Sequence, residues 1–348
     1  MIPLPGDLGP DPYWTEDLWS RPIRWRARPP HETLAGLATD ERVCAVAGAL
    51  AGWRLLSADH LARFGRVSAA DLAGVVLPAM WRAGLVERGA FDVLGVEAPA
   101  LYRLRSGPEL SGWLAGLDPA AWLSVTAGEP VGGARSLGRH DLLAAEVGLR
   151  ASEAGVGLQA VFPESLARPS LLVPGSGSTR AKGDLVIVRE DGLRVVVELT
   201  ASRTPELTAK VARWGRLLAA GDAGLVVVFL TAATPGGDQA GLVRKGIPKA
   251  FESVLCPEGL GLAGAWATNE EVSRARKGLA VADWEDWFPG PGCCSTAFPA
   301  LEARFLVPRS EGRWGTVGLA RQYPFEPEDP SEWLWPGKER ERVLAAPA

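Results

Sequence analysis

The stretch that most restricts the fold is "AKGDLVIVREDGLRVVVELTAS", residues 181–202, in which two β-rich runs flank an Asp-Gly pair. This pattern predicts an antiparallel hairpin. Asp184 and Glu198 lie near the outer ends of the two runs. Because successive residues of a strand point to opposite faces, the length of the turn decides whether these two carboxylates share a face.

A two-residue turn of Asp191 and Gly192 would place Asp184 opposite Leu199. Asp184 and Glu198 would then point to opposite faces of the hairpin, and they could not bind one metal ion.

A three-residue loop at 190–192, with the glycine in the left-handed position of a bulged turn, would instead place Asp184 opposite Glu198 and Lys182 opposite Thr200. We favour this register because it separates polar from apolar residues more cleanly. The face opposite the acids then becomes wholly apolar, with Leu185, Ile187, Leu193, Val195, Val197 and Leu199.

Two carboxylates about 4 Å apart repel by roughly 4 kcal/mol at an effective dielectric constant near 20, so a cation is needed between them. Magnesium suits carboxylate oxygens, and we expect Asp184 and Glu198 to be its ligands. The alternative is a structural ion pair in which Lys182 or Arg194 supplies the positive charge.

The elements around the hairpin predict a mixed sheet flanked by helices. The expected helices are 138–154, which carries Glu146, then 205–220, 237–253 and a short one after Asn269. The expected strands are 157–163, 184–190, 193–200, 224–231 and 261–267.

Residues 40–105 predict three helices followed by a two-stranded hairpin, the outline of a winged helix-turn-helix. Ser57 and Ser68 are expected helix caps, and Gly84 is the expected stop. The third helix is mostly apolar, so its use for protein contact or dimerisation competes with DNA binding. The candidate phosphate contacts in this part are Arg66, Arg82, Arg88 and Arg103.

The fold class that we predict is therefore α/β (α+β mixed), in four parts. Residues 1–38 form an extended Pro/Trp/Arg-rich arm, 39–115 a winged helix-turn-helix, 136–282 a nuclease-like domain, and 283–348 an irregular Pro/Trp-rich extension. In the arm, Arg24 and Arg26 flank Trp25 and could contact phosphates. The alternative is a solvated arm with Trp25 docked on the fold.

Charge and composition narrow the functional classes. The net charge is −4, so nucleic-acid binding would have to come from local basic patches. The cysteines and histidines lack the spacing of a zinc or redox site. The longest apolar run is too short for a bilayer, and the first residues lack the pattern of a secretory signal. We expect a cytoplasmic protein with no membrane partner.

A helix with an inward acid, a hairpin with Asp on one strand and Glu on the next, and a crossover helix together resemble the PD-(D/E)xK nuclease core. The resemblance implies that Asp184 and Glu198 bind magnesium, with Glu146 as a further ligand. Thr200 stands where that core has its lysine, which weakens the prediction of an active nuclease. Lys182 could replace that lysine; Lys210 is a second candidate, although Glu206 offers it an ordinary helical ion pair.

The order of a winged helix followed by "GDLVIV…VVVELTAS…KVARW" is similar to the replication-relaxation family of actinobacterial plasmids, phages and integrative elements. This resemblance implies a double-stranded DNA partner, other replication or mobilisation proteins as further partners, and a role in replication or mobilisation. Three functions follow: a DNA-binding accessory protein with a nuclease-like domain of reduced or lost activity, an active magnesium-dependent endonuclease using Asp184, Glu198 and Lys182, or a protein-interaction factor. The oligomeric state is left open.

Overall fold

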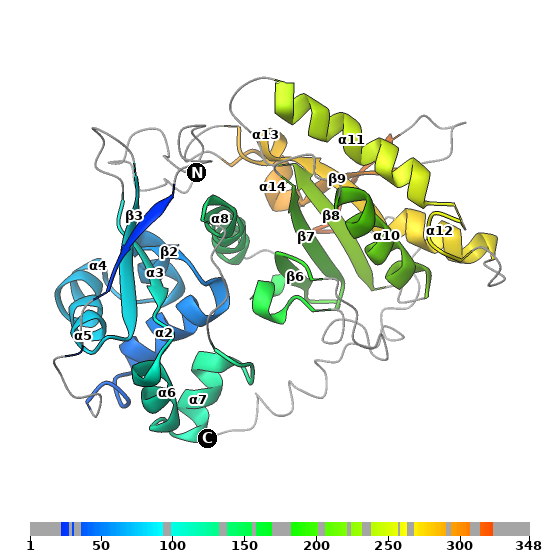
Figure 1. Cartoon of the computed structure of the whole chain (residues 1–348). Coiled ribbons are helices and arrows are strands. Elements are labelled where there is room, and N and C mark those ends of the chain that lie inside the picture. The colour runs from blue at the N-terminus through cyan, green and yellow to red at the C-terminus, as the bar shows by residue number, and fades with distance from the viewer. Residues whose placement is uncertain are drawn as a thin grey trace. The chain divides into compact units, whose positions relative to one another are not determined.

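The protein has a mixed α/β fold with a four-stranded and a seven-stranded sheet in the part that the structure describes, the larger sheet being mixed (Figure 1). This computed structural model describes residues 22–27, 30, 36–92, 99–131, 138–154, 158–168, 182–200, 206–220, 224–231, 238–256, 258–262, 268–289, 294–306 and 314–322. Two compact units divide after Arg150. Within the described ranges, no helix is both long and apolar enough to cross a bilayer.

The N-terminal unit contains the three predicted helices and the predicted hairpin. Its elements in chain order are β1 (Ile23–Arg26), α2 (Glu41–Trp53), β2 (Leu56–Ser57), α3 (Ala58–Phe64), α4 (Ala69–Asp71), the π-helical segment η2 (Leu72–Val76), α5 (Leu77–Arg82), β3 (Val86–Phe91), β4 (Leu101–Leu104), α6 (Pro108–Ala115), α7 (Pro119–Thr126) and most of α8 (Arg139–Ala154). The predicted caps are confirmed, because Ser57 and Ser68 accept backbone N–H groups of His60 and Asp71.

The sheet of this unit has the order β1-β3-β4-β2. Residues 23–26 of the predicted extended arm form β1, which pairs antiparallel with β3. Trp25 lies on the face that packs against Leu55, Phe91 and Leu101. Gly89, its partner across the strands, leaves room for the indole, since a Cβ at Gly89 would lie 2.8 Å from the ring. Trp25 is therefore docked on the fold.

The C-terminal unit is built on the seven-stranded sheet, with the order β11-β10-β9-β8-β7-β6-β5. Its elements are β5 (Leu158–Pro163), η3 (Glu164–Leu166), β6 (Leu185–Arg189), β7 (Arg194–Thr200), α10 (Glu206–Ala219), β8 (Leu225–Thr231), α11 (Asp238–Val254), α12 (Asn269–Gly278), β9 (Leu279–Asp283), α13 (Trp284–Trp287), α14 (Ala297–Ala300), β10 (Glu302–Leu306) and β11 (Trp314–Gly318). Strands β7, β8 and β9 are parallel, so their carboxyl ends meet at one edge of the sheet.

The predicted hairpin register is confirmed. Leu185 pairs with Val197, and the same register continues to the turn, where the amide of Arg189 donates to the carbonyl of Leu193. Three residues, 190–192, close the loop, and Gly192 has φ +92°, as a bulged turn requires.

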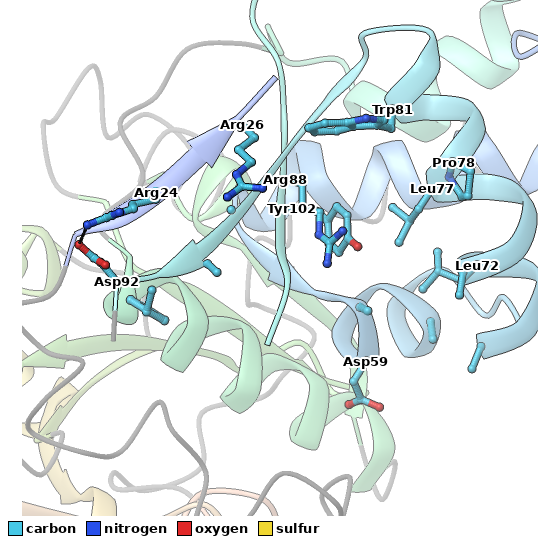
Figure 2. Close-up of a pocket in the computed structure, with 17 residues that line it drawn as sticks. Arg24, Arg26, Asp59, Leu72, Leu77, Pro78, Trp81, Arg88, Asp92 and Tyr102 are labelled. Atoms are coloured by element: carbon cyan, nitrogen blue, oxygen red, sulfur yellow. Dashed lines mark ion pairs between the residues drawn. The ribbon is translucent and has the colours of Figure 1, made fainter. Parts of the chain in front are cut away.

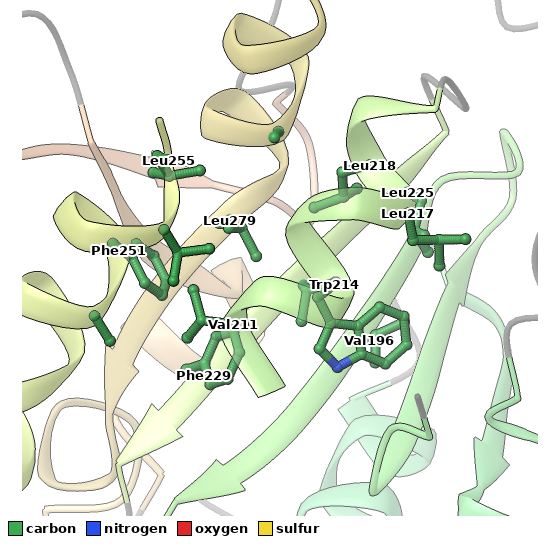
Figure 3. Packing of buried hydrophobic residues seen from close by; sticks show 14 of the residues in the cluster. Val196, Val211, Trp214, Leu217, Leu218, Leu225, Phe229, Phe251, Leu255 and Leu279 are labelled. Atoms are coloured by element: carbon green, nitrogen blue, oxygen red, sulfur yellow. The ribbon is translucent and has the colours of Figure 1, made fainter. Parts of the chain in front are cut away.

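Both faces of this hairpin are buried. The acid-bearing face packs against α10, α11 and α12 through a hydrophobic cluster that includes Val196, Val211, Trp214, Phe229 and Phe251 (Figure 3). The residues of the predicted apolar face are at most 3% exposed. The two carboxylates therefore lie at one end of the hairpin, and the rest of both strands is part of the hydrophobic core.

Three further predictions need correction. The extension from 283 onward is not irregular throughout, because β10 and β11 complete the sheet. Of the expected strand 261–267, residues 261–262 are not in a strand and the rest lies outside the described residues. The boundary predicted before 136 falls after Arg150, because Gly148 of α8 packs against Trp53 and Leu142 joins the core of the N-terminal unit. Residues 323–348 lie outside the described part.

Candidate functional site

The C-terminal unit holds a buried acid pair at the carboxyl edge of its parallel strands. The register that pairs Leu185 with Val197 brings Asp184 opposite Glu198, as predicted. The side chain of Asp184 accepts the backbone N–H of Leu199 at 2.7 Å. This hydrogen bond joins the carboxyl end of β7 to the residue that precedes β6. Both acids are nearly inaccessible to solvent.

Both oxygens of Glu198 are held by the crossover helix α10. Lys210 Nζ lies 2.7 Å from Oε2, and Trp214 Nε1 donates to Oε1 at 2.6 Å. Lys210 and Trp214 are one turn apart on α10, so a single face of the helix supplies both donors. Lys210 therefore pairs with Glu198 rather than with Glu206, and the indole donor had not been singled out from the sequence.

The protonation of Glu198 is set by opposing effects. Burial first, and the neighbouring charge of Asp184 second, raise the pKa of Glu198 from 4.5 to about 7, although Lys210 and Trp214 favour the ionised form. For Lys210, burial lowers the pKa, but the two carboxylates outweigh burial and raise it. The site at neutral pH is thus a lysine cation facing two acids that compete for ionisation.

The other predicted members of this site have different surroundings. Lys182, the predicted replacement for the lysine of the nuclease core, forms an ion pair with Glu164 at 2.9 Å. Thr200 is buried and lies next to Thr231 of β8. The guanidinium of Arg194 is fully buried and donates to a backbone carbonyl at 3.3 Å.

A second polar group lies at the same edge of the sheet. Thr231 donates its hydroxyl to Asp283, and Arg304 forms an ion pair with the same carboxylate. Asp283 and Arg304 line a small pocket of about 200 Å³ together with Pro248 and Trp314. This group was not predicted from the sequence, because its members come from β8, β9 and β10, and neither β9 nor β10 was among the expected strands.

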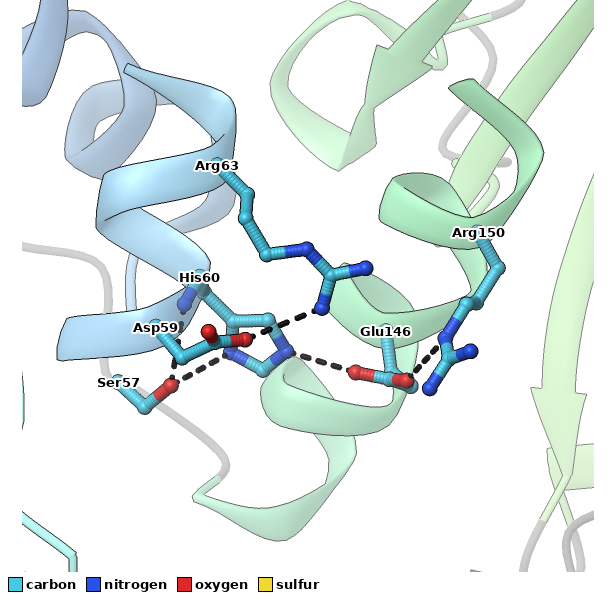
Figure 4. A network of polar contacts seen from close by, with 6 residues as sticks. All are labelled: Ser57, Asp59, His60, Arg63, Glu146 and Arg150. Carbon is cyan, nitrogen blue, oxygen red and sulfur yellow. Dashed lines mark hydrogen bonds and ion pairs between the residues drawn. The ribbon is translucent and has the colours of Figure 1, made fainter. Parts of the chain in front are cut away.

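Glu146, the predicted third metal ligand, forms a different network in the N-terminal unit (Figure 4). Its carboxylate accepts from His60 Nε2 at 2.9 Å and from Arg150 Nε at 2.7 Å, and all three side chains are buried. Burial by itself would raise the pKa of Glu146, but His60 and Arg150 outweigh it and lower the pKa from 4.5 to about 2. Glu146 is thus an ionised structural anchor between α3 and α8.

Three of the predicted arginine contacts share one face of the four-stranded sheet. Arg26 lies directly opposite Arg88 across β1 and β3, and Arg88 lies opposite Tyr102 of β4. Arg24, two residues before Arg26, is on the same face and pairs with Asp92 at 2.6 Å. All three arginines line a groove with a volume of about 950 Å³ (Figure 2).

The remaining arginine predictions are not brought together with these three. Arg103 lies on the opposite face, where it contacts Glu87 at 2.6 Å and stacks 4.1 Å from the centre of the Trp25 ring. Arg66 and Arg82 are exposed at the two ends of the third helix.

The acid pair has the ligand chemistry of a magnesium site, because hard cations bind carboxylate oxygens. Among the described residues, however, no group of three or more His, Cys, Asp or Glu side chains is placed to hold a metal ion. Both oxygens of Glu198 already have protein donors. A divalent cation between Asp184 and Glu198 would therefore have to share Glu198 with Lys210 and Trp214.

Comparisons with protein-family models, with curated proteins and with solved structures gave no match.

Proposed function

We propose that the chain is a DNA-binding accessory protein of plasmid, phage or mobile-element replication or mobilisation, with a PD-(D/E)xK-like domain of reduced or lost activity. The order of α2, α3, α4–α5 and the β3–β4 hairpin supports a winged helix-turn-helix. The order of β5, β6, β7, α10 and β8 supports the nuclease-like core. The proposed role in replication or mobilisation comes from the resemblance of the sequence alone.

The observation that carries DNA binding is the pair of arginines on β1 and β3. Arg26 and Arg88 are exposed and directly opposite, and neither has an ion-pair partner within the part of the chain that is described. Like charges in such cross-strand pairs destabilise a sheet. A phosphate bound between the two guanidinium groups would remove that cost and form charge-assisted hydrogen bonds.

Salt-dependent binding to duplex DNA tests this proposal. Removing two phosphate contacts with Arg26→Ala and Arg88→Ala should weaken binding and reduce the slope of log K against log salt by about 2. Arg42→Ala is the matched control, because Arg42 is an exposed arginine of the same unit that is already paired with Asp40 at 2.9 Å. No binding at low salt, or equal slopes for all variants, would refute the proposal.

The observation that supports reduced chemistry is the Lys210–Glu198–Trp214 arrangement. A lysine and an indole N–H occupy both oxygens that would otherwise bind a cation. We therefore expect no cleavage of plasmid DNA, or only slow cleavage, in magnesium.

An active magnesium-dependent endonuclease is the second candidate, and the placement of Asp184 opposite Glu198 favours it. In that case these two carboxylates would hold the cation, which would supply positive charge at the phosphate. Lys210 would then be free to contact the substrate. Plasmid nicking in magnesium or manganese that disappears in Asp184→Ala and Glu198→Ala would replace the first proposal with this one.

A further inference from the structure

The groove of the N-terminal unit has two walls of different chemistry. One wall is formed by Arg24, Arg26 and Arg88 of the β-strands, and the other by apolar side chains of η2 and α5 (Figure 2). Leu72, Leu77 and Trp81 are on the helical wall. A volume of about 950 Å³ is at the upper end of the range of small-ligand pockets.

The acidic residues of the groove do not cancel its basic wall. Asp92 is paired with Arg24, and Asp59 is paired with Arg63 of its own helix at 3.0 Å. The positive charge on the strands is therefore available to an anionic ligand at Arg26 and Arg88.

The apolar wall restricts which anion fits. Leu72 and Leu77 are nearly inaccessible, so the ring of Trp81 is the main apolar surface that this wall offers a ligand. A duplex presents hydrated phosphates and keeps its bases stacked inside the helix, so it has no free base face to place on that ring. An unpaired strand presents phosphates and base faces together. Aromatic side chains beside basic residues are the usual platform for such strands. Trp81 of α5 and Tyr102 of β4 are both half-buried and line the groove from its two walls.

We propose that this groove binds an unpaired DNA segment, with phosphates at Arg26 and Arg88 and at least one base stacked on Trp81 or Tyr102. This inference rests on the proposed DNA binding and names the form of DNA that the groove accepts. The proposal also gives the apolar third helix of the predicted winged helix-turn-helix a role in DNA binding that does not require contacts with base edges in a groove. An acidic amphipathic peptide shares part of this chemistry, and it is tested below as the competing occupant.

The experiment compares three fluorescent probes on the full chain: a short single strand, its duplex, and the same strand with abasic sites in place of bases. We expect the wild type to bind the single strand more tightly than the other two probes. Trp81→Ala should lose about ten-fold affinity for the single strand, and little or none for the abasic strand or the duplex. Trp81→Phe, which keeps an aromatic face, should restore most of the loss.

The variants separate this inference from the proposed function. Arg26→Ala with Arg88→Ala should weaken binding of every probe. Duplex binding that depends on these arginines, together with equal affinity for the single and abasic strands, would refute the groove assignment and leave DNA binding intact. Failure of all three probes to bind would refute both proposals.

Two controls keep the result interpretable. Trp81→Ala and Trp81→Phe must unfold at the same temperature as the wild type; if Trp81→Ala does not, Tyr102→Leu tests the opposite wall with the same expectation. The second control is an acidic amphipathic peptide. If this peptide displaces the single strand from the wild type and binds more tightly than the single strand, the groove belongs to a protein partner and the inference is overturned.

Discussion

Glu146 of the N-terminal unit and Glu198 of the C-terminal unit are both buried, and each binds one cationic side chain and one ring N–H group. Their pKa values nevertheless move in opposite directions, to about 2 for Glu146 and about 7 for Glu198. Burial raises the pKa of both groups, but His60 and Arg150 together outweigh it at Glu146, whereas Glu198 also faces the charge of Asp184, a second carboxylate. A buried acid with cationic partners is thus a stable anchor, and a second acid turns the same arrangement into a site that can exchange protons or bind cations.

The largest expected effect comes from removing the charge of Glu146. Glu146→Gln should destabilise the N-terminal unit by about 3 kcal/mol or more, because it removes the buried charge that both His60 and Arg150 bind. Glu198→Gln should change the stability of its unit by only about 1 kcal/mol, because it also relieves the repulsion with Asp184. Hydrogen exchange measured separately for α8 and β7 would resolve the two units. Equal losses would show that the two glutamates are equivalent structural anchors.

Loss of the cationic partner should also destabilise the fold more at Glu146 than at Glu198. Arg150→Met is expected to cost several kcal/mol, because the side chain is 2% exposed and its loss takes a charged hydrogen-bond partner from the buried Glu146. Lys210→Met should cost less, about 1 kcal/mol, because Lys210 is 32% exposed and Glu198 can take up a proton near neutral pH. Urea unfolding at pH 7 with the same exchange probes would test the order, and a larger loss for Lys210→Met would reverse the comparison.

The two glutamates should also affect stability at different pH values. The raised pKa of Glu198 means that the folded state holds a proton that the unfolded state has released between pH 4.5 and 7, so this group lowers stability as pH rises through that window. The lowered pKa of Glu146 stabilises the fold above pH 4.5, and this contribution is lost as pH falls towards 2. Each effect is the difference in unfolding free energy between wild type and the corresponding Gln variant, measured across pH. A Glu198→Gln difference that is constant between pH 4.5 and 7 would contradict the assignment.

The smallest expected effect comes from removing the charge of Asp184, the acid beside Glu198. Asp184→Asn keeps an oxygen that can accept the Leu199 N–H but removes the charge, so the pKa of Glu198 should fall below 7. Carboxyl NMR titration would report this fall. A pKa of Glu198 that stays near 7 in the variant would mean that burial alone sets it, and the contrast with Glu146 would then not depend on the acid pair.

The sequence predicted the hairpin better than it predicted the partners of its acids. The turn length, the glycine with positive φ and the alternation of polar and apolar residues are local, and they gave the correct register of Asp184 and Glu198. The strands β10 and β11 have no comparable pattern, because they are short and only their place in the sheet stabilises them. Glu198 pairs with Lys210 because of the side of α10 that packs against the sheet, and the sequence does not indicate that side.

The partners of Glu146, which lies on a helix, were also not predictable from the sequence. The resemblance to the nuclease core implied an inward position for Glu146 on its helix, but nothing near it in the sequence indicates His60, which is 86 residues away. Gly148, which allows Trp53 to pack closely, draws this part of α8 into the N-terminal unit. A carboxylate on an inward face has several available cations, and only packing decides which of them it meets.

The amino-acid sequence by itself determined the hairpin, its register and the helix caps, because these depend on backbone geometry and on residues within a few positions of one another. Tertiary structure alone decided that Glu198 is held by Lys210 and Trp214, that Glu146 belongs to a separate ion-pair network, and that Arg26 and Arg88 lie opposite each other. The contacts of Glu198 and of Glu146 are buried, and burial makes them strong enough to set the charge of each carboxylate. The placement of Arg88 opposite Arg26 depends on the pairing of two strands that are far apart in the chain.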